Sequence, residues 1–497
     1  MKKSYILLSA VLTLCLSACG GNKGGNKDKE QTPVKEPNME INFNKVADNC
    51  MVPSYVKAYI DAMHEQEGEI HYPHRVDPLK CNMTYEEARD LPSHGDGHTY
   101  DEETEAGGVD VCTMLRQQSS TPYENKPLEL TWSKGDKTFS ENAELVFWSD
   151  VEKSDKRSVS LEEGGESAKL PNLMRNTKYY YQLIDGDNAS QMKSFVTGDY
   201  TRMISLPGVG GRSVTNIRDM GGYQSSYGCM IRQGLIFRGG EVNQEPLTAD
   251  GQTRQTNYDQ TENSADQIAE QEVMNIGLEL DLRTKSGCGN KTESAFAYDG
   301  DWVWENTYPN TTLNENTNGR AQYVRCAINS YDKLLTDPNR SSEGDNANRN
   351  LVKEIFEYFA KADEQHVYFH CWGGADRTGV TGFLLLGILG ATYTDAIIDF
   401  ELTTLTNNKR CHMHNSTNAD FPKFLYKFVT TQSFERDGEE YTYTFEEDKT
   451  LRYNAENLLI AMGVEQQTIE KIRTIMLPGY VTGKTQESEA ENKGWHS

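Results

Sequence analysis

The most constraining feature of this 497-residue chain is one continuous segment, VYFHCWGGADRTGVTGFLLLGIL, at positions 367–389. Its first four residues predict a short strand, and its apolar second half, which begins near Arg377, predicts a helix. Between them lies a loop that starts at Cys371 and contains two glycines. Such a loop can turn successive backbone N–H groups inward, and the N-terminus of the following helix adds the positive end of its dipole. The segment therefore predicts a cradle for an anion.

A cysteine at the start of this cradle changes what the loop can do. The same field that binds a phosphate group favours a thiolate over a thiol, so we expect Cys371 to be nucleophilic at neutral pH. Arg377 supplies a planar guanidinium that can bind two phosphoryl oxygens at once. A thiolate, inward amides and a guanidinium that converge on one anion predict phosphoryl transfer to sulfur.

These residues also carry a family resemblance. Cys371, five intervening residues, Arg377 and Thr378 match the C-x5-R-[ST] signature of the cysteine-dependent protein-tyrosine phosphatase superfamily. HCWGGADRTG resembles the HCxxGxDRTG loop of its bacterial tyrosine and lipid phosphatase branch. The upstream segments TNIRDMGGY, GLIFRGGEV and LELDLRT are similar in content and order to that branch's NxRDxGG, LxRS and DLR segments. The resemblance covers about residues 205–480.

The resemblance implies a role for each residue of the loop. Cys371 attacks phosphorus and forms a phosphocysteine, while Arg377 and the loop amides hold the phosphoryl oxygens. Thr378 hydrogen-bonds the sulfur. His370 orients the loop and favours the thiolate, with a buried structural histidine as the alternative. The implied phosphate-binding positions are Trp372, Gly373, Gly374, Ala375, Thr378 and Gly379.

A general acid must protonate the leaving oxygen and then activate water. In this branch an aspartate inside the loop is a candidate, which corresponds to Asp376. Asp281 in the DLR segment and Asp219 in the NIRD segment are rivals, although either could be structural, pairing with a neighbouring arginine or capping a turn. Asp345 is a further candidate for a mobile acid loop, but its polar surroundings indicate a solvated insertion. Asp376 is the favoured acid.

The substrate is less well defined by the sequence. The branch often has lysine before the loop aspartate, whereas this chain has Ala375, which argues against highly charged inositol polyphosphates. Trp372 is interpreted either as a platform for a substrate ring or as packing under the loop, and Arg218 and Arg238 either as substrate contacts or as braces. A protein-tyrosine phosphatase is the leading hypothesis. A phosphoinositide or inositol phosphate phosphatase and a catalytically silent phosphate-binding module are the alternatives.

The N-terminal segment MKKSYILLSAVLTLCLSACGG predicts export. Two lysines precede a short apolar run, as in a signal peptide, and LSAC resembles a bacterial lipobox. We therefore expect a signal peptide over 1–18, a lipid anchor at Cys19 and a flexible tether over 19–36, with a plain secretory signal as the alternative. No acidic residue stands at position 20, which favours the outer membrane of the cell envelope.

The rest of the chain divides into regions that differ in their pattern of polar and apolar residues. Residues 37–125 are poorly patterned, and 126–200 contain short β-type runs that resemble a fibronectin type III-like β-sandwich. From 201 to 480 strands alternate with helices, which predicts an α/β domain with a largely parallel sheet flanked by helices. Residues 481–497 are expected to form a disordered tail. The predicted fold is thus an α/β phosphatase domain preceded by a small β-sandwich.

Composition argues against two classes of partner. The formal net charge is −25 with no stripe of Lys and Arg, so we expect no nucleic acid partner. The eight cysteines after Cys19 include no CxxC pair, and histidine pairs such as that in HGDGH are interpreted as solvated. The sequence therefore predicts no metal ion and no cofactor. The expected partners are a phosphorylated protein or small phosphomonoester, and a membrane through the lipid anchor.

Overall fold

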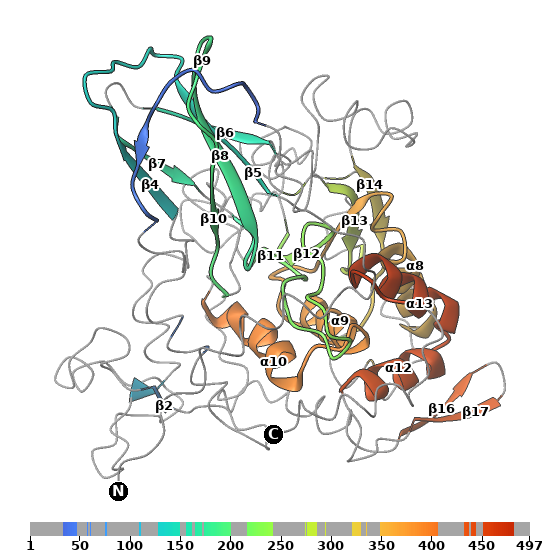
Figure 1. Cartoon of the computed structure of the whole chain (residues 1–497). Coiled ribbons are helices and arrows are strands. Elements are labelled where there is room, and N and C mark those ends of the chain that lie inside the picture. Colours follow the sequence, from blue (N-terminus) through green and yellow to red (C-terminus); the bar gives the residue numbers. More distant parts are fainter. Residues whose placement is uncertain are drawn as a thin grey trace, which may run out of the picture.

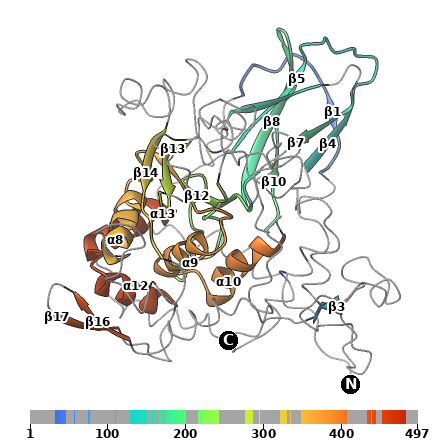
Figure 2. The same ribbon diagram turned by 180° about the vertical axis from the view of Figure 1, so that it is seen from behind.

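The computed structural model places two modules side by side, one made of β-strands and one of strands and helices (Figures 1 and 2). It describes residues 33–46, 128–149, 156–161, 165–170, 173–199, 216–241, 276–285, 321–329, 348–405, 432–436, 439–443 and 451–481, with a few isolated positions between them. Cys19, Asp345, the predicted signal peptide, most of 37–125 and nearly all of the tail lie outside the described residues. The lipid anchor and the export of the chain stay predictions.

The first module contains two antiparallel sheets that share one core. One sheet has the strand order β1-β4-β7, and the other β10-β8-β5-β6 with β9 paired to β8. The strands are β1 (Asn42–Phe43), β4 (Leu128–Ser133), β5 (Glu144–Ser149), β6 (Arg157–Ser160), β7 (Ser167–Leu170), β8 (Lys178–Asp185), β9 (Asn188–Ala189) and β10 (Lys193–Val196). Trp132 and Leu170 from one sheet pack with Phe147 and Phe195 from the other.

Strand β8 shows why this region folds as strands. Tyr179, Tyr181 and Leu183 alternate into the core between the two sheets, as the two-residue period predicts. Tyr180 and Ile184 pack on the opposite face in a smaller apolar cluster. The module begins earlier than residue 126, because β1 pairs with β4 and the segment from residue 33 contacts β8 and β9. The resemblance to fibronectin type III-like modules stays a prediction.

The second module is built on a five-stranded sheet of order β11-β12-β15-β13-β14. Its strands are β11 (Arg218–Asp219), β12 (Ile236–Gly239), β13 (Ile276–Asp281), β14 (Gln322–Arg325) and β15 (His366–His370). All neighbours are parallel except β11 and β12. The described helices are α8 (Asn348–Phe359), α9 (Arg377–Ile388), α10 (Tyr393–Glu401), the short 3₁₀ helix η3 (Leu402–Leu405), α12 (Leu451–Ala461) and α13 (Gln466–Met476).

The two faces of this sheet differ in chemistry. Leu278, Leu280, Val367 and Phe369 lie on one face and share a continuous apolar core with α8, α9, α10, α12 and α13. Residues alternate between faces along a strand, so the residues between these point to the other face. That other face carries polar side chains that are also fully buried, namely Glu279, Asp281 and His370 with Tyr368. The fold thus buries a polar layer under the end of β15.

The two modules are joined through a contact at Arg175. Its backbone N–H donates to the side chain of Gln233 at 3.0 Å, and the Gln233 amide donates back to the Arg175 carbonyl at 2.7 Å. The Arg175 guanidinium lies over the ring of Tyr223, 4.2 Å from its centroid. These contacts attach the β-rich module to the connection between β11 and β12.

Two outlying strand pairs complete the described elements. Strand β2 (Arg75–Val76) pairs with β3 (Val109–Asp110), and β16 (Gln432–Arg436) pairs with β17 (Glu439–Tyr443), both antiparallel. Within the described part of the chain, no helix has the length and apolar character needed to cross a bilayer.

Candidate active site

The predicted loop lies where the sheet ends and a buried helix begins. Cys371 follows directly after β15, the central strand of the sheet, and α9 begins at Arg377. The carboxyl ends of the parallel strands β12, β13 and β15 meet at this edge, which is where α/β sheets commonly bind ligands. Cys371 is 3% exposed and forms no disulfide. The nucleophile predicted from the sequence is thus held at the base of the loop.

The first two carbonyls of the loop are tied to groups outside it. The carbonyl of Cys371 accepts a hydrogen bond from Nδ1 of His370 at 2.9 Å. The carbonyl of Trp372 accepts from the backbone N–H of Glu241, just after β12, at 3.0 Å. Both bonds come from the sheet side of the loop, so they fix the first two peptide planes.

The next two carbonyls are held in the same way. Asn216 donates from Nδ2 to the carbonyl of Gly373 at 3.0 Å, and Arg238 donates from Nη2 to the carbonyl of Gly374 at 2.8 Å. Asn216 is itself fixed by Thr403, whose Oγ1 lies 3.1 Å from Nδ2. Each donor comes from a segment distant in sequence, so the loop geometry is a product of the whole module.

This arrangement sets the direction of four amides. A trans peptide is planar, so the N–H of each residue points opposite to the carbonyl of the residue before it. Since four consecutive carbonyls are bonded to groups around the loop, the N–H groups of residues 372–375 point away from those groups. Amides turned together in this way can hold an anion beside Cys371. Backbone geometry therefore agrees with the cradle that the sequence predicts.

The last residues of the loop lie at the N-terminus of α9. The Arg377 guanidinium donates to the carbonyl of Leu282 at 3.0 Å, which holds it against the end of β13. The buried Thr378 hydroxyl has no hydrogen-bond partner, so the predicted bond to Sγ of Cys371 is not formed in this structure. Asp376 stands at the N-cap of α9, but its carboxylate caps no backbone N–H and is partly exposed.

Asp281 is engaged in an ion pair under the loop. Its two carboxylate oxygens accept from Nε and Nη2 of Arg283 at 2.8 and 2.7 Å, and the Tyr323 hydroxyl donates to it at 3.0 Å. The side chain is fully buried. This is the structural role that the sequence left open for Asp281, and it removes the side chain as a route for protons to a leaving group.

Asp219 stabilises a turn. Its carboxylate accepts from the backbone N–H groups of Gly221 at 2.7 Å and Gly234 at 2.6 Å. Burial raises the pKa of Asp219 to about 7, against these two hydrogen bonds and the charge of Arg175, which favour the ionised form. Because neighbouring strand residues point to opposite faces, Asp219 points away from the side on which Arg218 supports the loop. We therefore do not assign it to the chemistry.

Arg218 and Arg238 brace the module. Both side chains are fully buried and both bind the carboxylate of Asp399 in α10, with Nε of Arg218 at 2.8 Å from Oδ1. Arg238 bridges this carboxylate to the loop carbonyl of Gly374. Of the two interpretations offered by the sequence, the structure favours the brace.

Sequence reasoning did not find Asn216, Glu241, Glu279 or Asp399. Asp399 could have been noticed in the sequence, since it is a single charged residue within the apolar helical run AIIDF. Asn216 is the first residue of the NIRD segment, but the sequence assigned it no role, and it adopts a positive φ of 70°. Asn216 and Glu241 bond loop carbonyls directly, whereas Glu279 and Asp399 act through His370 and Arg238, so their roles depend on tertiary structure.

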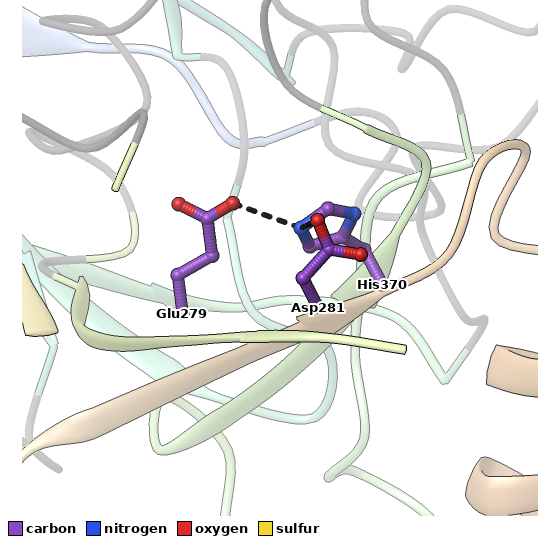
Figure 3. A group of neighbouring side chains, drawn as sticks. All are labelled: Glu279, Asp281 and His370. Atoms are coloured by element: carbon purple, nitrogen blue, oxygen red, sulfur yellow. Dashed lines mark hydrogen bonds and ion pairs between the residues drawn. The ribbon is translucent and has the colours of Figure 1, made fainter. Parts of the chain in front are cut away.

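One group of side chains has metal-ligand atoms close together. Among the described residues, ligand atoms of Glu279, Asp281 and His370 lie within 4.8 Å of one another (Figure 3). The donor set does not suit a cation, because both oxygens of Asp281 are bonded to the fixed positive charge of Arg283. We therefore interpret the group as part of the hydrogen-bonded layer under the loop.

Comparison with known families agrees with the site. The model of the tyrosine phosphatase family matches residues 211–478, more than half of the chain and the whole of the sheet and loop just described. The chain therefore belongs to the tyrosine phosphatase family, and its second module is a phosphatase domain of that type. No curated protein matches the chain.

Proposed function

We propose that the protein is a metal-independent phosphomonoester hydrolase that uses Cys371 as nucleophile. The thiolate attacks phosphorus, the bond from phosphorus to the leaving oxygen breaks, and that oxygen takes a proton from Asp376. Water then attacks phosphorus and gives a proton to Asp376, the bond between phosphorus and sulfur breaks, and phosphate and the Cys371 thiolate are released. Arg377 and the loop amides hold the phosphoryl oxygens in both steps.

The observation that carries this proposal is the set of four consecutive carbonyls, those of residues 371–374, that are bonded to groups around the loop. They orient successive amides before any substrate arrives, so little reorganisation is needed as charge redistributes. The lone buried hydroxyl of Thr378 supports the same mechanism, because a thiolate that leaves the phosphocysteine would supply the acceptor that the hydroxyl lacks. Family membership supports phosphatase activity independently.

We propose phosphotyrosine as the substrate class. Trp372 is 46% exposed beside the buried Cys371, which favours a platform for a substrate ring over packing beneath the loop. Ala375 adds no positive charge, so the site is poorly suited to several phosphate groups at once. The test is turnover of an aryl phosphate with EDTA present, followed by phosphotyrosine peptides and phosphoinositides. Faster turnover of a phosphoinositide would favour a lipid phosphatase, and binding without turnover a silent module.

Asp376→Ala is expected to slow the enzyme most with substrates whose leaving group needs a proton. We expect kcat to fall by about 10²-fold with phenyl phosphate and far less with p-nitrophenyl phosphate, because general acid catalysis contributes on that scale. The comparison requires kcat for both substrates in the variant and the wild type. Asp281→Ala is the control: because Asp281 is not the proposed acid, any loss of kcat in this variant should be the same for both substrates. Equal losses with both substrates in the Asp376 variant would contradict its role as the acid.

Gly374→Ala is expected to lower kcat/KM for an aryl phosphate by about 10²-fold, the scale of one lost oxyanion donor. Gly374 has a φ of +67°, and a Cβ there would lie 2.4 Å from the backbone of Gly239. The loop must therefore shift. Gly228→Ala is the matched control, since Gly228 also has a positive φ but open space at its Cβ. Equal activity in the two variants would show that the loop position is not critical.

A further inference from the structure

Glu279 is a fully buried acid that the proposed mechanism does not use. It lies in β13, whose neighbour β15 ends at His370, and its side chain projects from the same face of β13 as Asp281 (Figure 3). Its Oε1 lies 2.9 Å from Nε2 of His370, and its Oε2 accepts from the hydroxyl of Ser294 at 2.7 Å. A buried acid costs free energy unless its hydrogen bonds are satisfied, so this arrangement requires an explanation.

The two hydrogen bonds of His370 fix where its protons lie. Nδ1 is bonded to the carbonyl of Cys371, and a carbonyl only accepts, so Nδ1 carries a proton. The contact between Nε2 and Glu279 also needs one proton, which resides either on the imidazole or on the carboxyl group. The Nδ1 proton is therefore required by the Cys371 carbonyl, whereas Glu279 gives Nε2 a hydrogen-bond partner in either case and so holds that edge of the ring.

The proton on Nδ1 determines the first amide of the loop. While His370 donates to the carbonyl of Cys371, the peptide plane between Cys371 and Trp372 is fixed, and the N–H of Trp372 points the opposite way. If Nδ1 lost its proton, two acceptors would face each other at 2.9 Å and the plane would turn. The first cradle amide would then lose its direction.

We propose that Glu279 is a positioning residue that anchors the His370 ring through Nε2, so that Nδ1–H stays directed at the Cys371 carbonyl and the Trp372 amide stays oriented toward the substrate anion. The inference rests on the proposed function for its consequence in catalysis, but its structural claim concerns His370 alone. The action is one of hydrogen bonding, not of charge. A glutamine can take the place of Glu279, because its amide N–H can donate to Nε2 while its oxygen accepts from Ser294.

The charged surroundings are consistent with a hydrogen-bonding role. Asp281 lies beside the pair, with Oδ2 at 4.0 Å from Nε2 of His370, and its charge is matched by Arg283, which also binds Glu241. The Tyr368 ring stacks on the His370 ring with centroids 5.4 Å apart. Tyr368 covers one face of the ring, so the position of the ring within its plane depends on its bonds to Glu279 and to the Cys371 carbonyl.

The test compares Glu279→Leu with Glu279→Gln in the full chain. We expect kcat/KM for p-nitrophenyl phosphate to fall by about tenfold or more in the leucine variant and to stay within about threefold of wild type in the glutamine variant, since losing one well-placed oxyanion donor costs up to about 10²-fold. Equal losses in both variants would overturn the proposal. Thermal unfolding of each variant checks that the fold is retained.

A double-mutant cycle separates positioning from general support of the core. In a His370→Asn background, Glu279→Leu should cost no further activity, because the residue through which it acts is gone. An additive loss would show that Glu279 supports the structure by another route and would overturn the proposal.

A spectroscopic measurement decides the structural claim without any activity. The ¹⁵N spectrum of the histidine rings, with His370 assigned by its loss in His370→Asn, should show a protonated Nδ1 in the wild type and in Glu279→Gln. A bare Nδ1 would overturn the proposal, even if Glu279→Leu failed to fold. If the wild type hydrolysed no phosphomonoester, the proposed function would fail, while this spectrum would still decide the state of His370.

Discussion

Cys371→Ser is expected to lower kcat/KM for an aryl phosphate by at least ~10⁴-fold, the scale seen when a covalent nucleophile is removed. Serine keeps nearly the same shape, but its hydroxyl is a much weaker nucleophile than the sulfur of cysteine. The amides of residues 372–375 and Arg377 would remain, so the variant should still bind inorganic phosphate. The measurement is steady-state turnover with EDTA present, together with phosphate binding by calorimetry.

Cys229→Ser is the matched control for this substitution. Cys229 also carries a thiol, but it lies in the connection between β11 and β12, where its carbonyl accepts from the backbone N–H of Ser225. Its substitution should leave turnover at the wild-type level. Retention of turnover in Cys371→Ser would remove the nucleophile from the account, whereas loss of turnover in both variants would indicate a general effect of thiol removal.

Asp399→Asn is expected to destabilise the protein by about 3–5 kcal/mol, the cost of breaking a buried ion pair from one side. The carboxylate lies between two arginines that are fully buried, and the substitution leaves both guanidinium charges facing each other. Burial lowers the pKa of Arg238 to about 10, and the charge of Arg218 acts in the same direction, so this pair is already costly with Asp399 present. Urea unfolding of the full chain measures the change.

The stabilisation by Asp399 should depend on pH in a defined direction. Burial alone would raise the pKa of Asp399, but Arg218 and Arg238 outweigh burial and hold the pKa below its ordinary value. The stabilisation is therefore fully present above the ordinary carboxyl pKa, about 3.9, and is lost as pH falls through the lower pKa of the folded state. The difference between wild type and Asp399→Asn should shrink only in this acidic range.

Asp395→Asn is the matched control for Asp399, because it lies one turn earlier in the same helix and is not fully buried. Its substitution should cost less than about 1 kcal/mol, as for a surface or capping position. If both variants were equally stable, the buried triad of Asp399 with Arg218 and Arg238 would not be a main support of the module.

The catalytic loop could be predicted from the sequence because its chemistry is local. Cys371, the glycines, Arg377 and the apolar helix that follows stand in one continuous segment, so the strand, the loop and the start of α9 are readable together. The alternation of β8 was equally readable, since one face of that strand packs in the module's main core. In both cases the physical cause lies within a few residues.

The supports of the loop could not be predicted in this way. Asn216 and Arg238 reach the loop carbonyls from segments more than a hundred residues away, and no local pattern records that proximity. Strand β13 alternates apolar with acidic residues, which alone would indicate a solvated acidic face, but both faces are buried and Glu279 faces His370. Helix α12 was missed as well, because its sequence mixes polar and apolar residues and its helical hydrophobic periodicity is weak.

The central claim is that phosphate passes through the sulfur of Cys371, and the most direct test is to trap that intermediate. Wild-type enzyme turning over an aryl phosphate is quenched rapidly in acid, digested and examined by mass spectrometry. The account predicts a phosphorylated peptide that contains Cys371, formed during turnover and missing from Cys371→Ser. Phosphate on a different residue, or rapid turnover with no phosphocysteine at any quench time, would contradict it.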